Sequence, residues 1–119
     1  MNKQKFHIKL NDNSFYTLGE YKDNVLTYYE SSKLRSKMSI NIKDKTIEKD
    51  NIDYQIKLSF NKKKSTNTIY LKKESGKIDI ETELKRFEIS TKKIIINYII
   101  VDSKEEVLLE IEGDFRWVL

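Results

Sequence analysis

The stretch "KIIINYIIV" (Lys93–Val101) carries seven apolar side chains in nine positions. Successive side chains of a β-strand point to opposite faces, so a strand made from this stretch is apolar on both faces. We expect one face to lie in the core of the protein, and it consists of Ile94, Ile96, Tyr98 and Ile100. The opposite face would form an apolar stripe in water, so it needs a cover of its own.

The outward stripe, which includes Ile95 and Ile99, has two candidate covers. One is the end segment "DFRWVL" (Asp114–Leu119), in which Phe115 and Trp117 are apolar enough to need burial themselves. The other is a second copy of the chain, packed against the stripe in a symmetric dimer. We therefore expect an interface formed by Ile95, Ile99, Phe115 and Trp117, either within a monomer or between the subunits of a homodimer.

Four further segments alternate apolar and polar side chains, as strands with one buried face do. They are "FHIKL" (Phe6–Leu10), "KMSINIKD" (Lys37–Asp44), "YQIKLSF" (Tyr54–Phe60) and "KIDIETEL" (Lys77–Leu84). The residues expected to share one interior are Met38, Ile40, Ile42, Ile56, Leu58, Ile78, Ile80 and Ile96. Since short polar turns lie between the segments, the pattern predicts an all-β fold of about nine or ten strands, closed into a barrel or folded as a sandwich.

Three places depart from plain alternation. Apolar parity shifts after Leu84, which predicts a β-bulge near Lys85 and Arg86. The stretch "YESSKLRSK" (Tyr29–Lys37) has little pattern, and we expect it to contain a short helical turn. The stretch "NKKKSTN" (Asn61–Asn67) is polar throughout and predicts a turn between two strands.

Composition narrows the class of protein. At 119 residues we expect a single domain, residues 1–119, with a real core, and the absence of cysteine excludes disulfides and thiolate metal sites. Lys and Arg exceed Asp and Glu by 23 to 19, but charges of both signs are interspersed, so we expect solubility and no nucleic-acid partner. No segment is apolar enough for a signal peptide or a membrane span. We therefore expect a cytoplasmic protein with no membrane partner.

Motifs for enzymatic chemistry do not occur in the sequence. His7 is the single histidine, which excludes multi-histidine metal sites, and it lies on the polar face of its strand beside Lys9. The chain has three glycines, and no phosphate-binding loop pattern occurs around them. We expect a non-enzymatic protein without metal or cofactor.

Glu30 has the most unusual position among the carboxylates. Side-chain parity places Leu26, Tyr28 and Glu30 on one face, and a carboxylate inside a barrel needs a partner or a raised pKa. Lys49 and Thr82 are the candidate partners. Because Glu30 closes its strand, the sequence favours exposure at the barrel rim over a buried role.

Three segments carry a resemblance to a known family: "LTYYES" (Leu26–Ser31), "GKIDIET" (Gly76–Thr82) and "IIINYII" (Ile94–Ile100). In order and spacing they are similar to the YwiB-like family of bacterial proteins, described as calycin-like β-barrels of unknown function. Where that family tends to have Arg-x-Gly after its fifth strand, this chain has "KDN" (Lys49–Asn51). The resemblance implies a single antiparallel calycin-like, or lipocalin-like, β-barrel of about eight to ten strands. By analogy it also implies small-molecule binding.

An inward set of bulky Ile, Leu, Tyr and Phe side chains predicts a barrel interior that is filled or holds one small ligand. We expect a ligand to be a small apolar or amphipathic molecule bound at the barrel mouth. Polar groups on otherwise apolar faces predict its contacts, which are Tyr28, Glu30, Thr82 and Tyr98. The alternative is an interaction module whose outer wall binds protein, or less readily RNA, at a cluster of Tyr70, Lys72 and Lys73.

Overall fold

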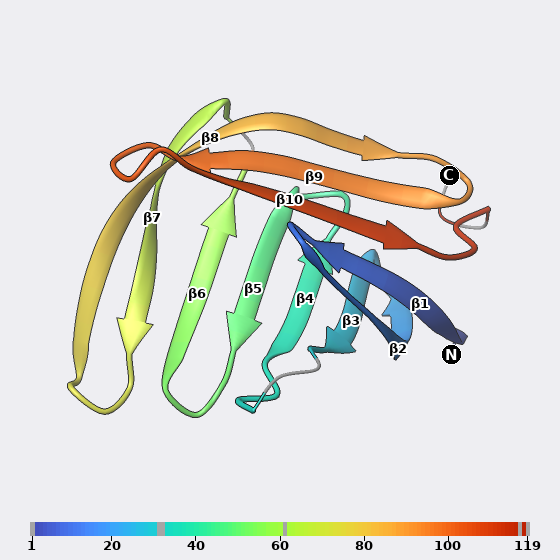
Figure 1. Ribbon diagram of the computed structural model, residues 1–119, viewed down its shortest axis with the longest axis horizontal. Coiled ribbons are helices and arrows are strands. Elements are labelled where there is room, and N and C mark those ends of the chain that lie inside the picture. The colour runs from blue at the N-terminus through green and yellow to red at the C-terminus, as the bar shows by residue number, and fades with distance from the viewer. Residues whose placement is uncertain (1, 31–32, 61, 117, 119) are drawn as a thin grey trace.

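The chain forms ten β-strands in the computed structural model, which describes residues 2–30, 33–60, 62–116 and 118 (Figure 1). The strands are β1 (Asn2–Leu10), β2 (Asn13–Lys22), β3 (Val25–Tyr29), β4 (Lys37–Asn41), β5 (Thr46–Asp50), β6 (Tyr54–Ser59), β7 (Lys64–Leu71), β8 (Gly76–Ile89), β9 (Lys93–Ile100) and β10 (Glu105–Glu112). The described residues contain no helix. The all-β prediction is therefore confirmed.

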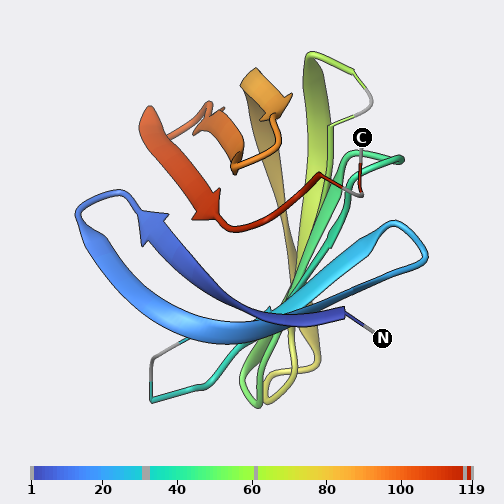
Figure 2. The same ribbon diagram turned by 90° about the vertical axis from the view of Figure 1, so that its right-hand side faces the viewer.

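The ten strands form one closed antiparallel barrel, seen from two sides in Figures 1 and 2. Each strand pairs with its neighbours along the chain, and β1 pairs with β10 to close the ring. In this closing ladder Ile8 lies opposite Ile111, and Leu10 lies opposite Leu109. The predicted antiparallel barrel is confirmed, and each of the ten described strands pairs with a neighbour on both sides.

Tight turns connect the strands, and several turn residues adopt positive φ. They are Asn11, Asp23, Asn24, Arg35, Lys45, Ser75 and Lys104. Asn11 also ties the β1–β2 turn to β10. Its N–H donates to the carbonyl oxygen of Leu108, and its Oδ1 accepts from the N–H of Leu108, both at 2.9 Å. This turn therefore reinforces the ladder that closes the barrel.

The core consists of inward side chains from most of the strands. Ile94 is fully buried and Tyr98 packs against the core, which confirms the inward face of β9. The buried members of the predicted interior are Met38, Ile40, Leu58 and Ile96, and the partly buried ones are Ile42, Ile56 and Ile80. The prediction is wrong for Ile78, which is 48% exposed. Ile78 lies near the tip of the β7–β8 hairpin, where too few neighbours surround an inward side chain to bury it.

Strand β8 contains the predicted β-bulge. Leu84 pairs with Tyr98, and Arg86 pairs with Asn97, so the register shifts between these two pairs. Leu84 and Phe87 both pack against the core as a result. The bulge prediction from apolar parity is confirmed.

Two local expectations differ from the structure. The predicted turn Asn61–Asn67 is shorter, because β7 already begins at Lys64. Asn67 is buried, and its Nδ2 donates to Oγ1 of Thr82 at 2.8 Å, so a polar residue in an inward position conceals the strand pattern. In the stretch Tyr29–Lys37, the residues that the structure describes include a turn at 33–34 and no helix.

Two stacked aromatic rings, Phe6 and Phe115, close one end of the barrel. Their centroids are 5.6 Å apart, and both side chains are fully buried. The chain after β10 crosses this end (Figure 2), and the N–H of Phe115 donates to the carbonyl oxygen of Thr91. Phe115 therefore packs inside the barrel and does not cover the outward stripe of β9, which corrects the interface prediction for this residue. Trp117 lies outside the described residues.

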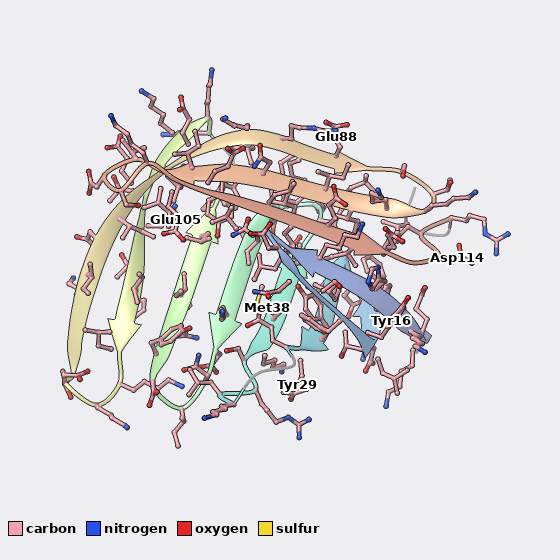
Figure 3. All side chains as sticks on the ribbon, in the orientation of Figure 1. Tyr16, Tyr29, Met38, Glu88, Glu105 and Asp114 are labelled. Atoms are coloured by element: carbon pink, nitrogen blue, oxygen red, sulfur yellow. The ribbon has the colours of Figure 1, made fainter. Side chains whose placement is uncertain are left out.

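The outward stripe of β9 is half-buried by its neighbours. Ile95 lies opposite Glu88 of β8 and Glu110 of β10, and Ile99 likewise lies between two glutamates. The aliphatic stems of long charged side chains cover apolar surface while their charged ends stay in water. Glu88 projects away from the barrel in Figure 3. The barrel wall thus covers much of this stripe by itself, and the homodimer stays a prediction.

Gly19 and Gly113 make room for the ring of Phe6. A Cβ added at Gly19 would lie 2.6 Å from this ring, and one added at Gly113 would lie 2.5 Å from it. We expect Gly19→Ala to lower the free energy of unfolding by about 1–3 kcal/mol, because the buried ring must move. Denaturant unfolding measures the loss, and Gly76→Ala is the control, since its nearest contact is at 4.0 Å.

A double-mutant cycle isolates the cause of this loss. In a Phe6→Ala background, Gly19→Ala should lose most of its effect, because the added Cβ no longer meets a ring. If the loss is the same in both backgrounds, the contact with Phe6 is not what requires glycine at position 19.

Candidate ligand-binding cavity

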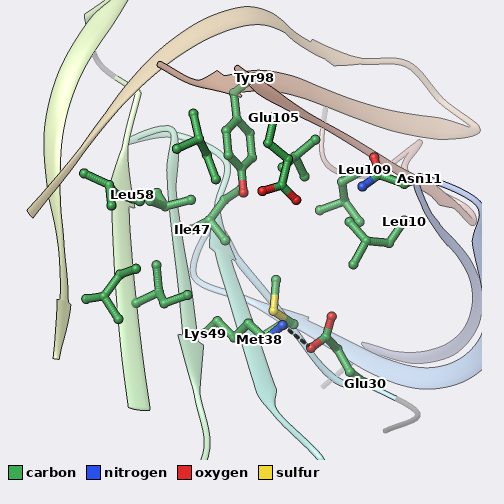
Figure 4. Close-up of a pocket in the computed structure, with 15 residues that line it drawn as sticks. Leu10, Asn11, Glu30, Met38, Ile47, Lys49, Leu58, Tyr98, Glu105 and Leu109 are labelled. Atoms are coloured by element: carbon green, nitrogen blue, oxygen red, sulfur yellow. Dashed lines mark ion pairs between the residues drawn. The ribbon is translucent and has the colours of Figure 1, made fainter. Parts of the chain in front are cut away.

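Side chains do not fill the barrel completely, and a cavity of about 300 Å³ lies between its inward faces (Figure 4). The apolar residues that line it are Leu10, Met38, Ile47, Ile56, Leu58, Ile69, Ile80, Ile100, Val107 and Leu109. The polar residues that line it are Asn11, Glu30, Lys49, Tyr98 and Glu105. A mostly apolar wall with a few polar groups is typical of small-molecule sites.

Strand register explains why a lysine reaches this cavity. Met38 lies opposite Lys49, Lys49 lies opposite Ile56, and Ile56 lies opposite Ile69. A row of inward side chains therefore crosses four neighbouring strands, and Lys49 is its charged member. A cation among apolar side chains needs an anion close by.

Glu30 supplies that anion. Its Oε1 lies 2.9 Å from Nζ of Lys49, and the two side chains are 10% and 26% exposed, respectively. Glu30 directly follows β3, and its N–H donates to the carbonyl oxygen of Ser36 at 2.9 Å, which holds its backbone in place. The expected exposure of Glu30 is therefore wrong, and of its two candidate partners it pairs with Lys49 and not with Thr82.

Two opposing effects determine the pKa of Lys49. Burial lowers this pKa, but the hydrogen bond and charge of Glu30, together with Tyr54, outweigh burial and raise it above its ordinary value. Lys49 is therefore an ammonium group at neutral pH. In this form it is neither a base nor a nucleophile.

Tyr28 lies opposite Met38 on the neighbouring strand and is almost fully buried. Its hydroxyl has no hydrogen-bond partner among the described residues. Burial, followed by the charge of Glu30 and the hydroxyl of Tyr98, raises the pKa of Tyr28 far above its ordinary value. A buried hydroxyl without a partner is unfavourable, so Tyr28 offers an unused hydrogen-bonding group close to two residues of the cavity wall.

Tyr98 and Glu105 project into the cavity from β9 and β10, with the carboxylate of Glu105 near the Tyr98 hydroxyl in Figure 4. Burial, followed by the charges of Glu105 and Glu30, raises the pKa of Tyr98 to about 12. No ion pair within the described part of the chain involves Glu105. Tyr98 is thus a neutral hydroxyl in a negative potential, beside a carboxylate that has no cation of its own.

The Glu30–Lys49 pair also lines a second recess, of about 660 Å³, together with Leu34 and Tyr54. Leu10, Glu30 and Lys49 line both spaces. The ion pair therefore lies at the boundary between the inner cavity and the outer recess. A molecule that reaches the cavity from this side passes the pair.

The structure gathers part of the ligand site that the sequence predicts. Glu30 and Tyr98 line the cavity, and both contribute, after burial, to the raised pKa of Tyr28, which is buried but does not line it. Thr82 does not line the cavity either, although it pairs with the cavity residue Ile100, and its hydroxyl accepts a hydrogen bond from Asn67. Three of the four predicted ligand contacts, Tyr28, Glu30 and Tyr98, are thus at or next to the cavity.

Asn11 and Glu105 line the cavity and are absent from the site that the sequence predicts. Glu105 belongs to a polar run, Asp102–Glu106, that is typical of an exposed turn, and the structure leaves it exposed. Its place follows from register, because Glu105 pairs with Ile100, an inward residue of β9. Side-chain alternation along β10 places Glu105 on the same inward face as Val107 and Leu109, so the sequence pattern contains this information.

The basic cluster on the outer wall is largely neutralised by aspartates. Tyr70 is 43% exposed, as expected for an outward residue. Nζ of Lys72 lies 2.6 Å from a carboxylate oxygen of Asp50, and Nζ of Lys73 lies 3.3 Å from one of Asp53. These pairs reduce the positive potential that would attract RNA.

His7 lies on the outer wall, away from the cavity residues. Its ring stacks on Tyr16 with centroids 4.5 Å apart, and its Nδ1 lies 3.8 Å from a carboxylate oxygen of Glu112. Within residues 2–30, 33–60, 62–116 and 118, no three side chains of His, Cys, Asp or Glu cluster as a metal site requires.

Fold and site together define a closed ten-stranded antiparallel β-barrel with a small, mostly apolar interior cavity. Comparison of the chain with known protein families, with curated proteins and with solved structures gives no match. The resemblance to the YwiB-like family therefore stays a prediction. Over the described portion of the chain, no helix has the length and apolar character needed to cross a membrane.

The buried tyrosines predict a loss of stability in alkali. Burial raises the pKa of Tyr28 and Tyr98, while in the unfolded chain both ionise near pH 10. The folded state then holds more protons than the unfolded state above about pH 10, so stability is complete below this pH and falls as pH rises. Each group contributes a slope of about 1.4 kcal/mol per pH unit.

Tyr28→Phe tests this assignment. We expect denaturant unfolding between about pH 10 and 12 to show a slope smaller by about 1.4 kcal/mol per pH unit than in the wild type. At neutral pH the variant should be at least as stable as the wild type, because the lost hydroxyl has no hydrogen-bond partner within the described part of the chain. Tyr70→Phe, on the outer wall, is the control, and an equal slope in wild type and Tyr28→Phe would contradict the burial of this hydroxyl.

Proposed function

We propose that this protein is a non-enzymatic, calycin-like binding protein of the cytoplasm that holds one small amphipathic molecule inside its barrel. The observation that carries the proposal is the 300 Å³ cavity, in which aliphatic walls surround a small set of polar side chains. Aliphatic walls bind an apolar body by the hydrophobic effect, and a few polar groups orient its head.

The volume of the cavity limits the size of the ligand. At about 30 Å³ for each water-sized group, the cavity accommodates about ten non-hydrogen atoms. This size suits a short amphiphile with a chain of a few carbons and one polar head. The inner cavity by itself is too small to enclose a sterol or a haem.

The protonation states of the polar groups support binding without catalysis. Lys49 is held as an ammonium by Glu30, and the pKa of Tyr98 is raised to about 12. A general base or nucleophile works best when its pKa lies near the operating pH, and these groups are shifted away from it. His7, the side chain best suited to proton transfer at neutral pH, lies on the outer wall.

A cavity-filling variant tests the proposal. Native mass spectrometry of the purified protein, followed by NMR titration with short amphiphiles, should detect one bound molecule per barrel. We expect Ile56→Phe, in the cavity wall, to weaken binding by about tenfold or more, whereas Ile52→Phe, at a site that is 73% exposed, should leave it unchanged. Equal binding by both variants, or no binding by the wild type, would contradict the proposal.

The second candidate function is protein binding through the outer wall. Tyr16 and Leu18 of β2 are 65% and 70% exposed, and Tyr29 of the neighbouring strand β3 is exposed as well. Exposed apolar side chains that lie together favour a protein contact. Analytical ultracentrifugation of the wild type and Leu18→Glu tests this, because self-association that Leu18→Glu abolishes would favour the second function.

A further inference from the structure

We infer that the cavity selects a cationic amphiphile, a short aliphatic amine, over a carboxylate such as a fatty acid. This inference rests on the proposed function and specifies its ligand. It follows from the charges that line the cavity and from the partners that these charges already have.

The cavity carries more negative than positive charge. Two carboxylates, Glu30 and Glu105, and one ammonium group, Lys49, line it. After burial, the negative charges of Glu105 and Glu30 raise the pKa of the Tyr98 hydroxyl. The head group of a ligand beside this hydroxyl would lie in the same negative potential. A positive head group therefore gains, and a negative one loses, on transfer into this space.

The charge of the cavity's ammonium group is already neutralised. Nζ of Lys49 lies 2.9 Å from Oε1 of Glu30. A ligand carboxylate could still reach a further N–H of Lys49, but it would then lie beside the carboxylate of Glu30, and like charges repel each other. Lys49 is therefore a poor anchor for an acidic ligand.

The carboxylate of Glu105, by contrast, is available. Glu105 is exposed at the start of β10, so its carboxylate lines the open side of the cavity, near the Tyr98 hydroxyl in Figure 4. The described residues provide no ion pair to it. An alkylammonium head has three N–H donors and needs acceptors for them when it leaves water. The carboxylate of Glu105 and the hydroxyl of Tyr98 are two such acceptors.

Tyr28 gives a second, independent observation. Its hydroxyl is buried without a hydrogen-bond partner among the described residues. After burial, the charges of Glu30 and Tyr98 both contribute to its raised pKa. A hydroxyl oxygen accepts a hydrogen bond as readily as it donates one. Tyr28 does not line the cavity itself, so its hydroxyl lies behind the polar wall that Glu30 and Tyr98 form, while the remaining wall is aliphatic and suits a hydrocarbon chain.

Three ligands of equal chain length test the inference: hexylamine, 1-hexanol and hexanoate, each titrated by NMR into the isotope-labelled full chain near neutral pH. We expect hexylamine to bind about tenfold or more tighter than hexanoate, with 1-hexanol between them. Glu105→Gln should weaken hexylamine by about tenfold and leave 1-hexanol unchanged. Glu106→Gln is the control, because it removes the same charge from the neighbouring position on the outer face of β10.

The outcomes separate the inference from the proposed function. If hexanoate binds as tightly as hexylamine, or if Glu105→Gln leaves hexylamine affinity unchanged, the charge selectivity is wrong while the binding barrel stands. If none of the three compounds binds in the cavity, the proposed function itself fails. A loss of amine binding in Glu106→Gln equal to that in Glu105→Gln would also overturn the inference, because it would indicate a general effect of surface charge.

Discussion

Replacing Phe6 with alanine is expected to lower the free energy of unfolding by about 3–5 kcal/mol. The ring of Phe6 is fully buried, stacks on Phe115 and fits closely against Gly19 and Gly113. Its removal leaves a cavity at the closed end, and glycine neighbours have no side chains to fill it. Denaturant unfolding with an unchanged m-value measures the loss.

The control for this experiment is Leu18→Ala on the outer wall. Leu18 is 70% exposed, so its truncation should change stability by less than about 0.5 kcal/mol. If Phe6→Ala costs less than about 1 kcal/mol, the Phe6–Phe115 stack does not close the barrel.

Lys49→Met is expected to lower the free energy of unfolding by about 3 kcal/mol. Methionine fits the apolar row around position 49, but it leaves the carboxylate of Glu30, which is 10% exposed, without its ammonium partner. Breaking one side of a buried ion pair costs about 3–5 kcal/mol, and the partial exposure of Lys49 favours the lower end of this range.

Removing the unpaired charge of Glu30 as well should restore stability. We expect the double variant Glu30→Gln/Lys49→Met to recover most of the loss, since neutral side chains need less solvation inside the barrel. The pair Lys73→Met and Asp53→Asn on the outer wall is the control, because exposed ion pairs contribute about 1 kcal/mol or less. A Lys49→Met variant as stable as the wild type would mean that water solvates the carboxylate of Glu30 and that the ion pair is not needed to stabilise it.

Much of the fold follows from side-chain parity alone. Alternation predicts the inward faces of β4 and β6, and the shift of parity after Leu84 predicts the bulge that the register shows. Parity also groups Tyr28 and Glu30 on one inward face. It fails for Ile78, because direction along a strand does not tell whether neighbours are present to bury the side chain.

The cavity could not be predicted in the same way. An unfilled space depends on how side chains from nine different segments meet across the barrel, and no local pattern records this. The sequence places Asn67 in a polar turn, because a polar residue in an inward position interrupts the alternation that identifies a strand. The buried place of Phe115 could not be predicted from the sequence either. The path of the chain after Gly113 depends on contacts with Phe6 and Thr91, which are distant in sequence.

The most direct measurement is the position of a bound short amine, read from nuclear Overhauser contacts between hexylamine and the methyl groups of the labelled protein. If the barrel is a binding protein, the alkyl chain should contact the methyls of Ile47, Leu58 and Leu109 in the cavity wall. Contacts to Leu18 on the outer wall, with none to these three residues, would contradict the account.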